Sequence, residues 1–354
     1  MTRVKVDDQL FLLNEQEIRA IRNREKLAIC ISAFIGAMGV LLQYIPYYKY
    51  PEWFHTRTVT VLDRTFDLPL IFLAYSILLV AIELILLTML NIWCTHEIAV
   101  ATGFLDHKTK PSPDKRNLML DIGLEKKNKQ VLTYGIDPLL GLNKKALLIW
   151  NLIFILKATL TNMFFRFMIQ RVMGRSVVKA VQDFAGIPVF AFWNAYGTYK
   201  ILKEARVVIM GQNLIEELIG KLQRRGEISE EGKSLISDTM QYIAVSKRDF
   251  HQNHYIMTRN LFEYFGIEER NGDWDENIFL EKIDQADPKL RENCILLILV
   301  GLILDGRISS REKARIRKLY GSGHIPFDVR DMEVLANDFK EGRGIQDVFK
   351  RYLA

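Results

Sequence analysis

The stretch LILVGLILDGRISSREKARIRKLY, residues 297–320, decides the fold of the C-terminal third, because an apolar run becomes a charged one at Asp305. The apolar run covers only residues 294–304, whereas a membrane-spanning helix needs about 20 apolar residues. Its length is that of a buried helix. Gly306 follows Asp305 and can take the left-handed conformation that commonly ends a helix. We therefore expect the chain to turn here in water and not in lipid.

A capping box starts the next helix. The hydroxyl of Ser309 can accept a hydrogen bond from the amide of Glu312, whose carboxylate can reach back to the amide of Ser309. The sequence therefore predicts helix, tight turn, helix. An EF-hand calcium loop fits poorly, because its register would place Gly301 and Ile303 at ligand positions. The second helix is expected to bury four side chains: Ile308, Ile316, Leu319 and Tyr320.

The same turn pattern occurs earlier in the chain. RGEISEE at 225–231 aligns with DGRISSR at 305–311 through Gly, Ile and Ser. The earlier copy has Arg225 in place of the acid and Gly232 in place of the capping glutamate. The pattern indicates a duplicated helix–turn–helix arrangement.

Residues 211–354 resemble the TerB-like (tellurite-resistance B-like) domains of bacteria. The resemblance rests on the apolar helix before Asp305-Gly306, on Ile308, Ser309 and Glu312, and on the KARIRKLY that follows. It implies a compact all-α domain, a role in envelope stress or defence assemblies, and a divalent metal held by acidic residues at the turn. Only Asp305 and Glu312 match as metal ligands, and no other cofactor is expected.

For Asp305 and Glu312, a metal-binding role and a structural capping role both stay open. The neighbouring Arg307 and Arg311 would oppose a cation and so favour the capping role.

Two apolar stretches predict an N-terminal hairpin of transmembrane helices, residues 27–95. Residues 27–48 carry no charge and would span about 33 Å as a helix. Residues 68–95 form the second predicted span and contain one charge, Glu83. The aromatic residues between and beside the spans are typical of a membrane interface: Tyr44, Tyr47, Tyr48, Tyr50, Trp53 and Phe54.

Lysine and arginine set the predicted orientation. They are dense in residues 96–145 and sparse in the loop 49–67, and such residues favour the cytoplasmic side. We expect a bacterial inner-membrane protein with both termini in the cytoplasm. In this scheme 1–26 is a cytoplasmic segment and 96–145 is a basic, solvated connector beside anionic lipid.

Residues 146–210 allow two arrangements. Lys157 and the basic residues of the connector favour an amphipathic hairpin at the membrane surface. The alternative is a second pair of true spans, with the connector outside. This region has a pattern similar to EcsC-like membrane-associated proteins, formed by Gly186, Pro188, Asn194 and Ala205.

Three further polar features are candidate sites. Glu83, inside a predicted span, is either an ion or proton site or an interhelical or oligomer contact. His251 and His254 lack further metal donors nearby in sequence and are expected on a polar, partly exposed helix face. Asp275 or Asp273 is expected to cap the helix that follows, which carries Ile278 and Phe279. The three cysteines form no disulfide framework.

We expect an all-α fold in which a transmembrane hairpin holds a cytoplasmic helical body that ends in the TerB-like domain. The expected function is an interaction or scaffold module at the inner membrane, with the bilayer and unidentified proteins as partners. The alternative is a channel or transporter subunit that uses Glu83 and 146–202. No enzyme motif occurs, and no aromatic residues interleave with the lysines to indicate nucleic acid. A homo-oligomer is left open.

Overall fold

The computed structural model describes residues 13, 15–55, 57–61, 64–68, 70–105, 115, 117–118, 129–140, 184, 186–249, 251–269 and 273–343. Its residues form two units. The long-helix unit comprises Arg22–Glu97 and Lys144–Lys203, and the helical domain comprises Met1–Ile21, Ile98–Asn143 and Glu204–Ala354. Residues 141–183, the first part of the predicted hairpin, lie outside the described residues.

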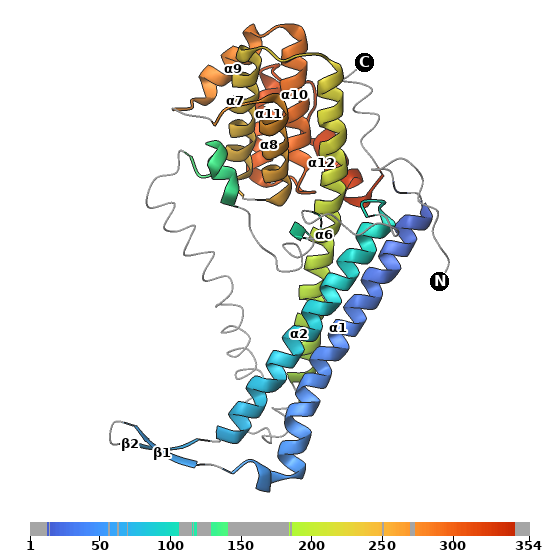
Figure 1. The fold of residues 1–354 in the computed structure, drawn as a ribbon, viewed down its shortest axis with the longest axis vertical. Coiled ribbons are helices and arrows are strands. Elements are labelled where there is room, and N and C mark those ends of the chain that lie inside the picture. Colours follow the sequence, from blue (N-terminus) through green and yellow to red (C-terminus); the bar gives the residue numbers. More distant parts are fainter. Residues whose placement is uncertain are drawn as a thin grey trace. The chain divides into compact units, whose positions relative to one another are not determined.

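The described elements are almost all helical, which confirms the all-α class of the predicted fold (Figure 1). One addition lies in the predicted outer loop. Strands β1 and β2 pair there as an antiparallel hairpin, with Arg57 opposite Leu68 and Val61 opposite Arg64. The elements are α1 (Glu15–Lys49), η1 (Pro51–Trp53), β1 (Arg57–Val61), β2 (Arg64–Leu68), α2 (Leu70–Ala101), η2 (Lys129–Tyr134), α6 (Gly186–Arg224), α7 (Glu230–Lys247), α8 (Gln252–Phe265), α9 (Glu276–Gln285), α10 (Pro288–Ile303), α11 (Ser310–Gly321) and α12 (Val329–Glu341).

In the long-helix unit, α1 and α2 lie side by side (Figure 1), and both are long and apolar enough to cross a membrane. They contain all of the first predicted span and residues 70–95 of the second, whose first residue, Leu68, belongs to β2 instead. Aromatic rings join the end of α1 to the start of α2. The ring of Tyr47 lies 4.7 Å from that of Phe72 and 5.8 Å from that of Phe54, measured between centroids.

The polar side chains of α2 lie on the face that packs against protein. Ser76 accepts a hydrogen bond from Gln43 of α1, and Asn91 and Thr95 are buried. The other faces expose large apolar side chains. This is the reverse of a water-soluble helix, which turns its polar side outward. The exposed apolar residues of α2 include Leu73, Ile77, Leu78, Leu84, Ile85 and Met89.

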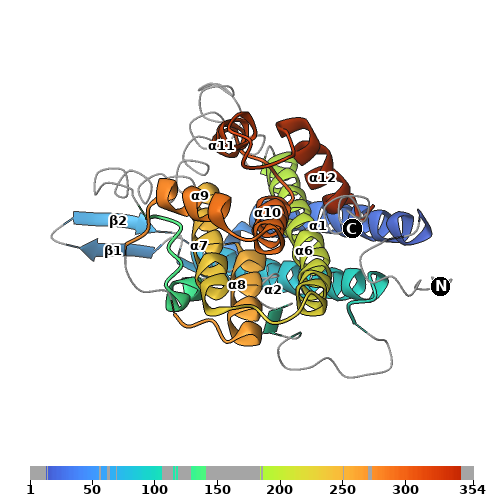
Figure 2. The ribbon, with the colours of Figure 1, turned by 90° about the horizontal axis from the view of Figure 1, so that it is seen from above.

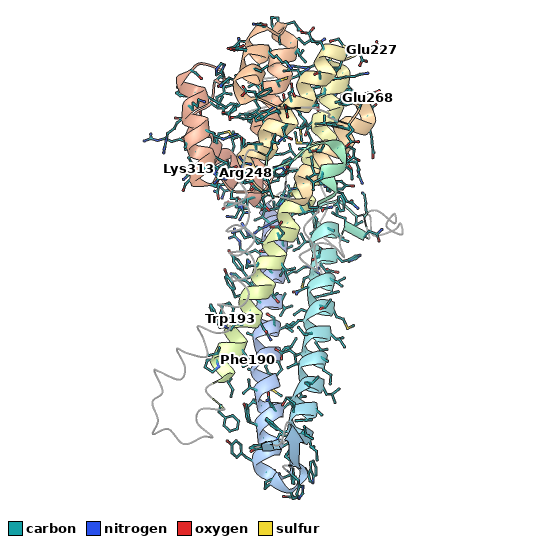
Figure 3. The ribbon with its side chains drawn as sticks, turned by 90° about the vertical axis from the view of Figure 1, so that its left-hand side faces the viewer. Phe190, Trp193, Glu227, Arg248, Glu268 and Lys313 are labelled. Atoms are coloured by element: carbon teal, nitrogen blue, oxygen red, sulfur yellow. The ribbon has the colours of Figure 1, made fainter. Side chains whose placement is uncertain are left out.

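The first half of α6, up to Lys203, packs lengthwise along α1 in the same unit. A Cβ added to Gly36 of α1 would lie 2.6 Å from the carbonyl oxygen of Phe190, so the two backbones nearly touch. Gly186 lies beside Val40, and the ring of Phe184 lies 6.1 Å from those of Tyr44 and Tyr48. The first half of α6 therefore runs antiparallel to α1. Figure 3 labels Phe190 and Trp193 on this half of the helix.

In the helical domain, α10 lies at the centre with α7, α8, α9, α11 and α12 around it (Figure 2). Every residue from Leu296 to Asp305 is buried, which explains why the sequence here is apolar on all sides. Gly301 permits the closest contact, because an added Cβ would lie 2.6 Å from a side-chain carbon of Ile243 on α7.

Both predicted helix–turn–helix units are present, as α6–α7 and α10–α11. Gly226 and Gly306 adopt left-handed backbone conformations, with φ of +106° and +67°. Ser229 caps α7 and Ser309 caps α11, where the predicted capping box with Glu312 is complete. Asp275 likewise caps α9, as predicted.

Three predictions about this domain are wrong, and one of them, the position of the two histidines, is described with the site. Tyr320 is 52% exposed instead of buried, because it lies on the outer face of α11, and Ile308 precedes α11 and is only half-buried. Ile316 and Leu319 are buried as predicted. Part of the predicted solvated connector also packs into the domain. The amide of Asp137 donates to the side chain of Gln241, whose own amide donates to the carbonyl of Asp137, each at 2.8 Å.

The close approach of α1 and α6 gives a direct test of the long-helix packing. We expect Gly36→Ala to destabilise the protein by about 1–3 kcal/mol, because the added methyl must displace the backbone at Phe190. Gly197→Ala is the matched control on α6, since an added Cβ there meets nothing within 4 Å. The midpoint of unfolding in mixed detergent micelles measures both. Equal midpoints for the two variants would show that the contact at Gly36 is not formed.

Candidate functional site

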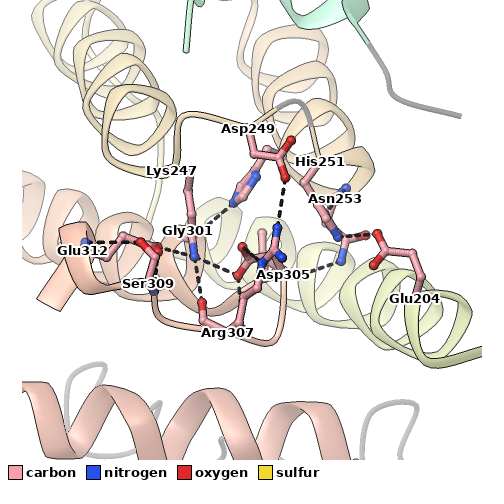
Figure 4. Close-up of polar contacts among 12 residues, drawn as sticks. Glu204, Lys247, Asp249, His251, Asn253, Gly301, Asp305, Arg307, Ser309 and Glu312 are labelled. Atoms are coloured by element: carbon pink, nitrogen blue, oxygen red, sulfur yellow. Dashed lines mark hydrogen bonds and ion pairs between the residues drawn. The ribbon is translucent and has the colours of Figure 1, made fainter. Parts of the chain in front are cut away.

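The predicted turn residues form one end of a buried ion cluster in the helical domain (Figure 4). The ammonium group of Lys247, the last residue of α7, lies 2.7 Å from Asp305 Oδ1 and also pairs with Glu312 Oε1. It donates to the carbonyl oxygen of Arg307 at 3.0 Å. The side chains of Lys247, Asp305 and Glu312 are 1%, 4% and 2% exposed. The cluster thus joins the end of α7 to the α10–α11 turn.

Charge in the cluster is balanced by a second cation at the surface. Two carboxylates share one lysine, which leaves an excess negative charge. Arg307 offsets it, because its guanidinium lies 3.4 Å from Asp305 and 3.1 Å from Asp249. Burial alone would raise the pKa of Asp305, but Lys247 and the nearby histidines bring this pKa below its ordinary value. Asp305 is therefore a carboxylate and not a carboxylic acid.

Asn253 of α8 binds two helices at once. Its side-chain amide donates to the carbonyl of Val207 on α6 at 3.0 Å and to that of Leu304 at 2.7 Å. Leu304 ends α10, so this bond satisfies one of the carbonyl groups that a helix end leaves without an intrahelical partner. Gly211 provides the room, since an added Cβ would overlap the Asn253 side chain.

Both histidines are buried, so their predicted position on a partly exposed helix face is wrong. His251 caps α8 through Nδ1, and its Nε2 lies 2.9 Å from Glu204. His254 Nε2 lies 2.7 Å from the carbonyl of Gly301. Burial and the neighbouring His251 lower the pKa of His254 to about 4. A neutral His254 that donates from Nε2 fits these facts.

The structure brings the two metal candidates, Asp305 and Glu312, together, but it places a lysine between them. The ammonium of Lys247 takes the position that a divalent cation would need and supplies the positive charge itself. In the part of the chain that the structure describes, no three His, Cys, Asp or Glu side chains form a group that could hold a metal. The residues present do not fit a divalent metal at this turn.

Sequence reasoning missed Lys247 and Asn253. Lys247 is 58 residues from Asp305 and, as a lysine in the last turn of a helix, gives no local signal of burial. Asn253 stands between the two histidines and looks like one more polar residue. Only the tertiary structure shows that both bind groups at the α10–α11 turn.

The second candidate is Glu83 in the long-helix unit. Its Oε1 accepts a hydrogen bond from the side-chain amide of Asn194 on α6, at 2.5 Å. Its Oε2 faces Gly39 of α1, where an added Cβ would lie 3.1 Å away. Glu83 therefore makes an interhelical contact between α2 and α6, over a glycine of α1.

Compared with models of protein families, with curated proteins and with solved structures, the chain has no match. The resemblances to TerB-like and EcsC-like proteins therefore stay predictions from the sequence.

The ion cluster should dominate the stability of the helical domain. We expect Lys247→Met to cost about 3–5 kcal/mol, because it leaves two buried carboxylates without a cation. Ser309→Ala should cost only about 1 kcal/mol, the usual value for a lost N-cap. Asp305→Asn should cost more than Ser309→Ala, since Asp305 is the buried partner of Lys247 and does more than end a helix. Hydrogen exchange of the α10 amides in the full chain measures all three.

The same measurement tests whether a metal binds the cluster. We expect a chelator to leave the exchange of the wild-type protein unchanged, because Lys247 is the cation. A chelator-induced loss of protection in the wild type, absent in Asp305→Asn, would contradict this assignment, since a bound metal stabilises the folded state by linkage.

His254 should make the domain sensitive to mild acid. Its pKa is about 4 when folded and 6.5 in the unfolded chain. Only the unfolded chain takes up the proton between these values, so stability falls as the pH drops from about 6.5 to 4, by about 3 kcal/mol in all. Asp305, whose pKa is lowered on folding, loses its contribution to the free energy of unfolding only below about pH 4.

His254→Gln keeps a donor for the Gly301 carbonyl and removes the titration. It should abolish most of the pH dependence of α10 exchange between pH 6.5 and 4. An unchanged slope in this variant would show that His254 is not the group responsible.

Proposed function

We propose that the protein is an integral protein of a bacterial inner membrane that holds its helical domain in the cytoplasm as an interaction scaffold. One observation supports the membrane part of the proposal: the large exposed apolar side chains of α1 and α2 surround an inner face that bears the polar ones. In water this arrangement is unfavourable, whereas in hydrocarbon it is the favourable one. The exposed large apolar residues described in the helical domain are scattered: Leu132, Tyr264, Ile278, Tyr320 and Val334.

The packing of α6 supports four crossings instead of two. If α1 and α2 cross the bilayer, α2 ends on the side where α1 begins. Phe184 and Gly186 lie beside Tyr44 and Val40, near the opposite end of α1. For the chain to return to that end between Ala101 and Phe184, the predicted crossing segment is the apolar stretch 146–165, which lies outside the described residues. In this arrangement the first half of α6, which is less apolar than α1 and α2, would be the fourth span, held against α1 at Gly36 and with Phe190 and Phe192 exposed to lipid.

Orientation follows from the lysine distribution, which favours the cytoplasm for both termini and for 106–145. The basic connector between the third and fourth spans would then lie outside. This departs from the usual distribution of basic residues. The close contact of Gly36 with α6 and the bond between Asn194 and Glu83 are the features that outweigh it.

Accessibility to a membrane-impermeant maleimide tests this topology. In a variant without the native cysteines, we expect single cysteines at Arg171 and Arg175 to react from outside in intact cells. A cysteine at Lys127 should react only after permeabilisation. If Arg171 and Arg175 behave like Lys127, the surface-hairpin arrangement is correct and the four-span proposal is wrong. Retention of the protein in membranes after alkaline carbonate washing tests membrane insertion itself.

The scaffold part of the proposal rests on the fact that the charged groups of the ion cluster are buried and bind only within the domain. Lys247, Asp305 and Glu312 are buried and bind one another, so their contacts rigidify the domain instead of binding a substrate. A rigid helical domain with a charged surface, fixed to a membrane, is suited to hold partners. The resemblance to TerB-like domains points the same way. The proposal assigns no reaction to the protein.

A second function, ion or proton movement through a channel or transporter, is favoured by one observation. Asn91 and Thr95 continue the polar face of α2 beyond Glu83, and their side-chain oxygens have no hydrogen-bond partner among the described residues. The substitution Glu83→Gln distinguishes the two functions. If Glu83 is a packing contact, the variant should retain the bond to α6 and normal assembly, with no change in ion flux in vesicles. Lost flux with intact assembly would favour the transport function.

A further inference from the structure

Two grooves of opposite charge lie on the surface of the helical domain. The acidic groove, between α6 and α8, has a volume of about 410 Å³ and is lined by Glu216, Ile219, Gln223, Glu263 and Tyr264 among others. No basic side chain lines it. The basic groove, between α11 and α12, has a similar volume of about 440 Å³.

Arginine side chains give the basic groove its charge. Arg317, Tyr320 and Arg330 line it, together with an ion pair between Lys313 and Glu333 that links its two walls. In the described part of the chain, neither Arg317 nor Arg330 has an ion-pair partner. The lining carboxylates are occupied locally: Glu333 pairs with Lys313, and Asp328 caps α12. Two arginines are therefore available to a ligand.

The acidic groove likewise has carboxylates that are available to a ligand. Glu216 is exposed and makes no salt bridge or side-chain hydrogen bond within the described residues, and Glu263 is approached only by the hydroxyl of Tyr134, at 3.5 Å. Each groove also has one exposed tyrosine, Tyr264 or Tyr320. Tyrosine and arginine are enriched at protein interfaces, and arginine binds carboxylates in a bidentate manner.

We propose that the basic groove of one copy of this protein binds the acidic groove of a second copy. Figure 2 shows α8 and α11 on opposite sides of α10, so one copy can use both grooves at once. A contact between two different surfaces is head-to-tail and gives rings or open chains. The proposal deepens the scaffold function proposed above and rests on it, because confinement to a membrane raises the effective concentration of weakly binding copies.

Charge reversal in two differently tagged copies tests the proposal in full-length protein in native membranes. A photo-reactive amino acid at Tyr320 of copy A should cross-link to copy B. Arg317→Glu with Arg330→Glu in copy A should reduce this cross-link about tenfold, since like charges then face each other. Glu216→Arg with Glu263→Arg in copy B should do the same. All four residues are exposed, so the fold should tolerate the changes.

The most informative experiment combines the two charge-reversed copies. When the reversed copy A meets the reversed copy B, attraction is restored and the cross-link should return. Arg311→Glu is the matched control, an exposed arginine of α11 that does not line the groove, and it should have no effect. The wild-type cross-link should also weaken at about 1 M salt, which screens charges beyond about 3 Å.

Several outcomes would overturn the proposal. These are cross-linking that survives both single-sided reversals, absence of rescue in the double reversal, and a cross-link at Tyr320 to lipid or to a different protein only. Each of these leaves the membrane placement intact, because carbonate washing and maleimide labelling measure that separately. Loss of the protein from washed membranes would instead contradict the proposed function.

Discussion

The helical domain depends on one buried ammonium group. Lys247 lies at the end of α7, and its partners Asp305 and Glu312 lie at the end of α10 and in the first turn of α11. Lys247 and Asp305 are 58 residues apart, so the cluster joins segments that are distant in sequence. Charges removed from water are costly unless they are paired with good geometry. The cluster therefore adds a directional constraint to the apolar packing of α7 against α10, in which Gly301 contacts Ile243.

The local features of this region could be predicted because they depend on neighbours in sequence. The capping box of Ser309 and Glu312, the left-handed Gly306 and the cap at Asp275 each need only a few consecutive residues. The duplication of the turn is visible for the same reason. The predicted burial of Tyr320 is wrong. The helical period indicates where the apolar face of α11 lies but not how wide it is, and Tyr320 falls just outside the buried face to which Leu319 belongs.

Long-range contacts could not be predicted in this way. Lys247, Asn253 and the histidines look like ordinary polar residues until α6, α8 and α10 come together around them. The same holds in the long-helix unit, where Glu83 stands out in the sequence as an unusual residue but its partner Asn194 lies 111 residues away. In the sequence, Asn194 is notable only as part of a family pattern. A polar group in an apolar helix signals that a partner exists without indicating which residue it is.

The contact between Gly211 and Asn253 also has an evolutionary consequence. Because the Asn253 side chain fills the space above Gly211, any side chain at position 211 would collide with it, while a smaller residue at 253 would leave the carbonyls of Val207 and Leu304 without their donor. A change at either position alone should therefore destabilise the helical domain. Descendants of this sequence should therefore keep both residues for long periods or replace them together, and a joint change at 211 and 253 would mark a lineage whose helical domain has been rearranged.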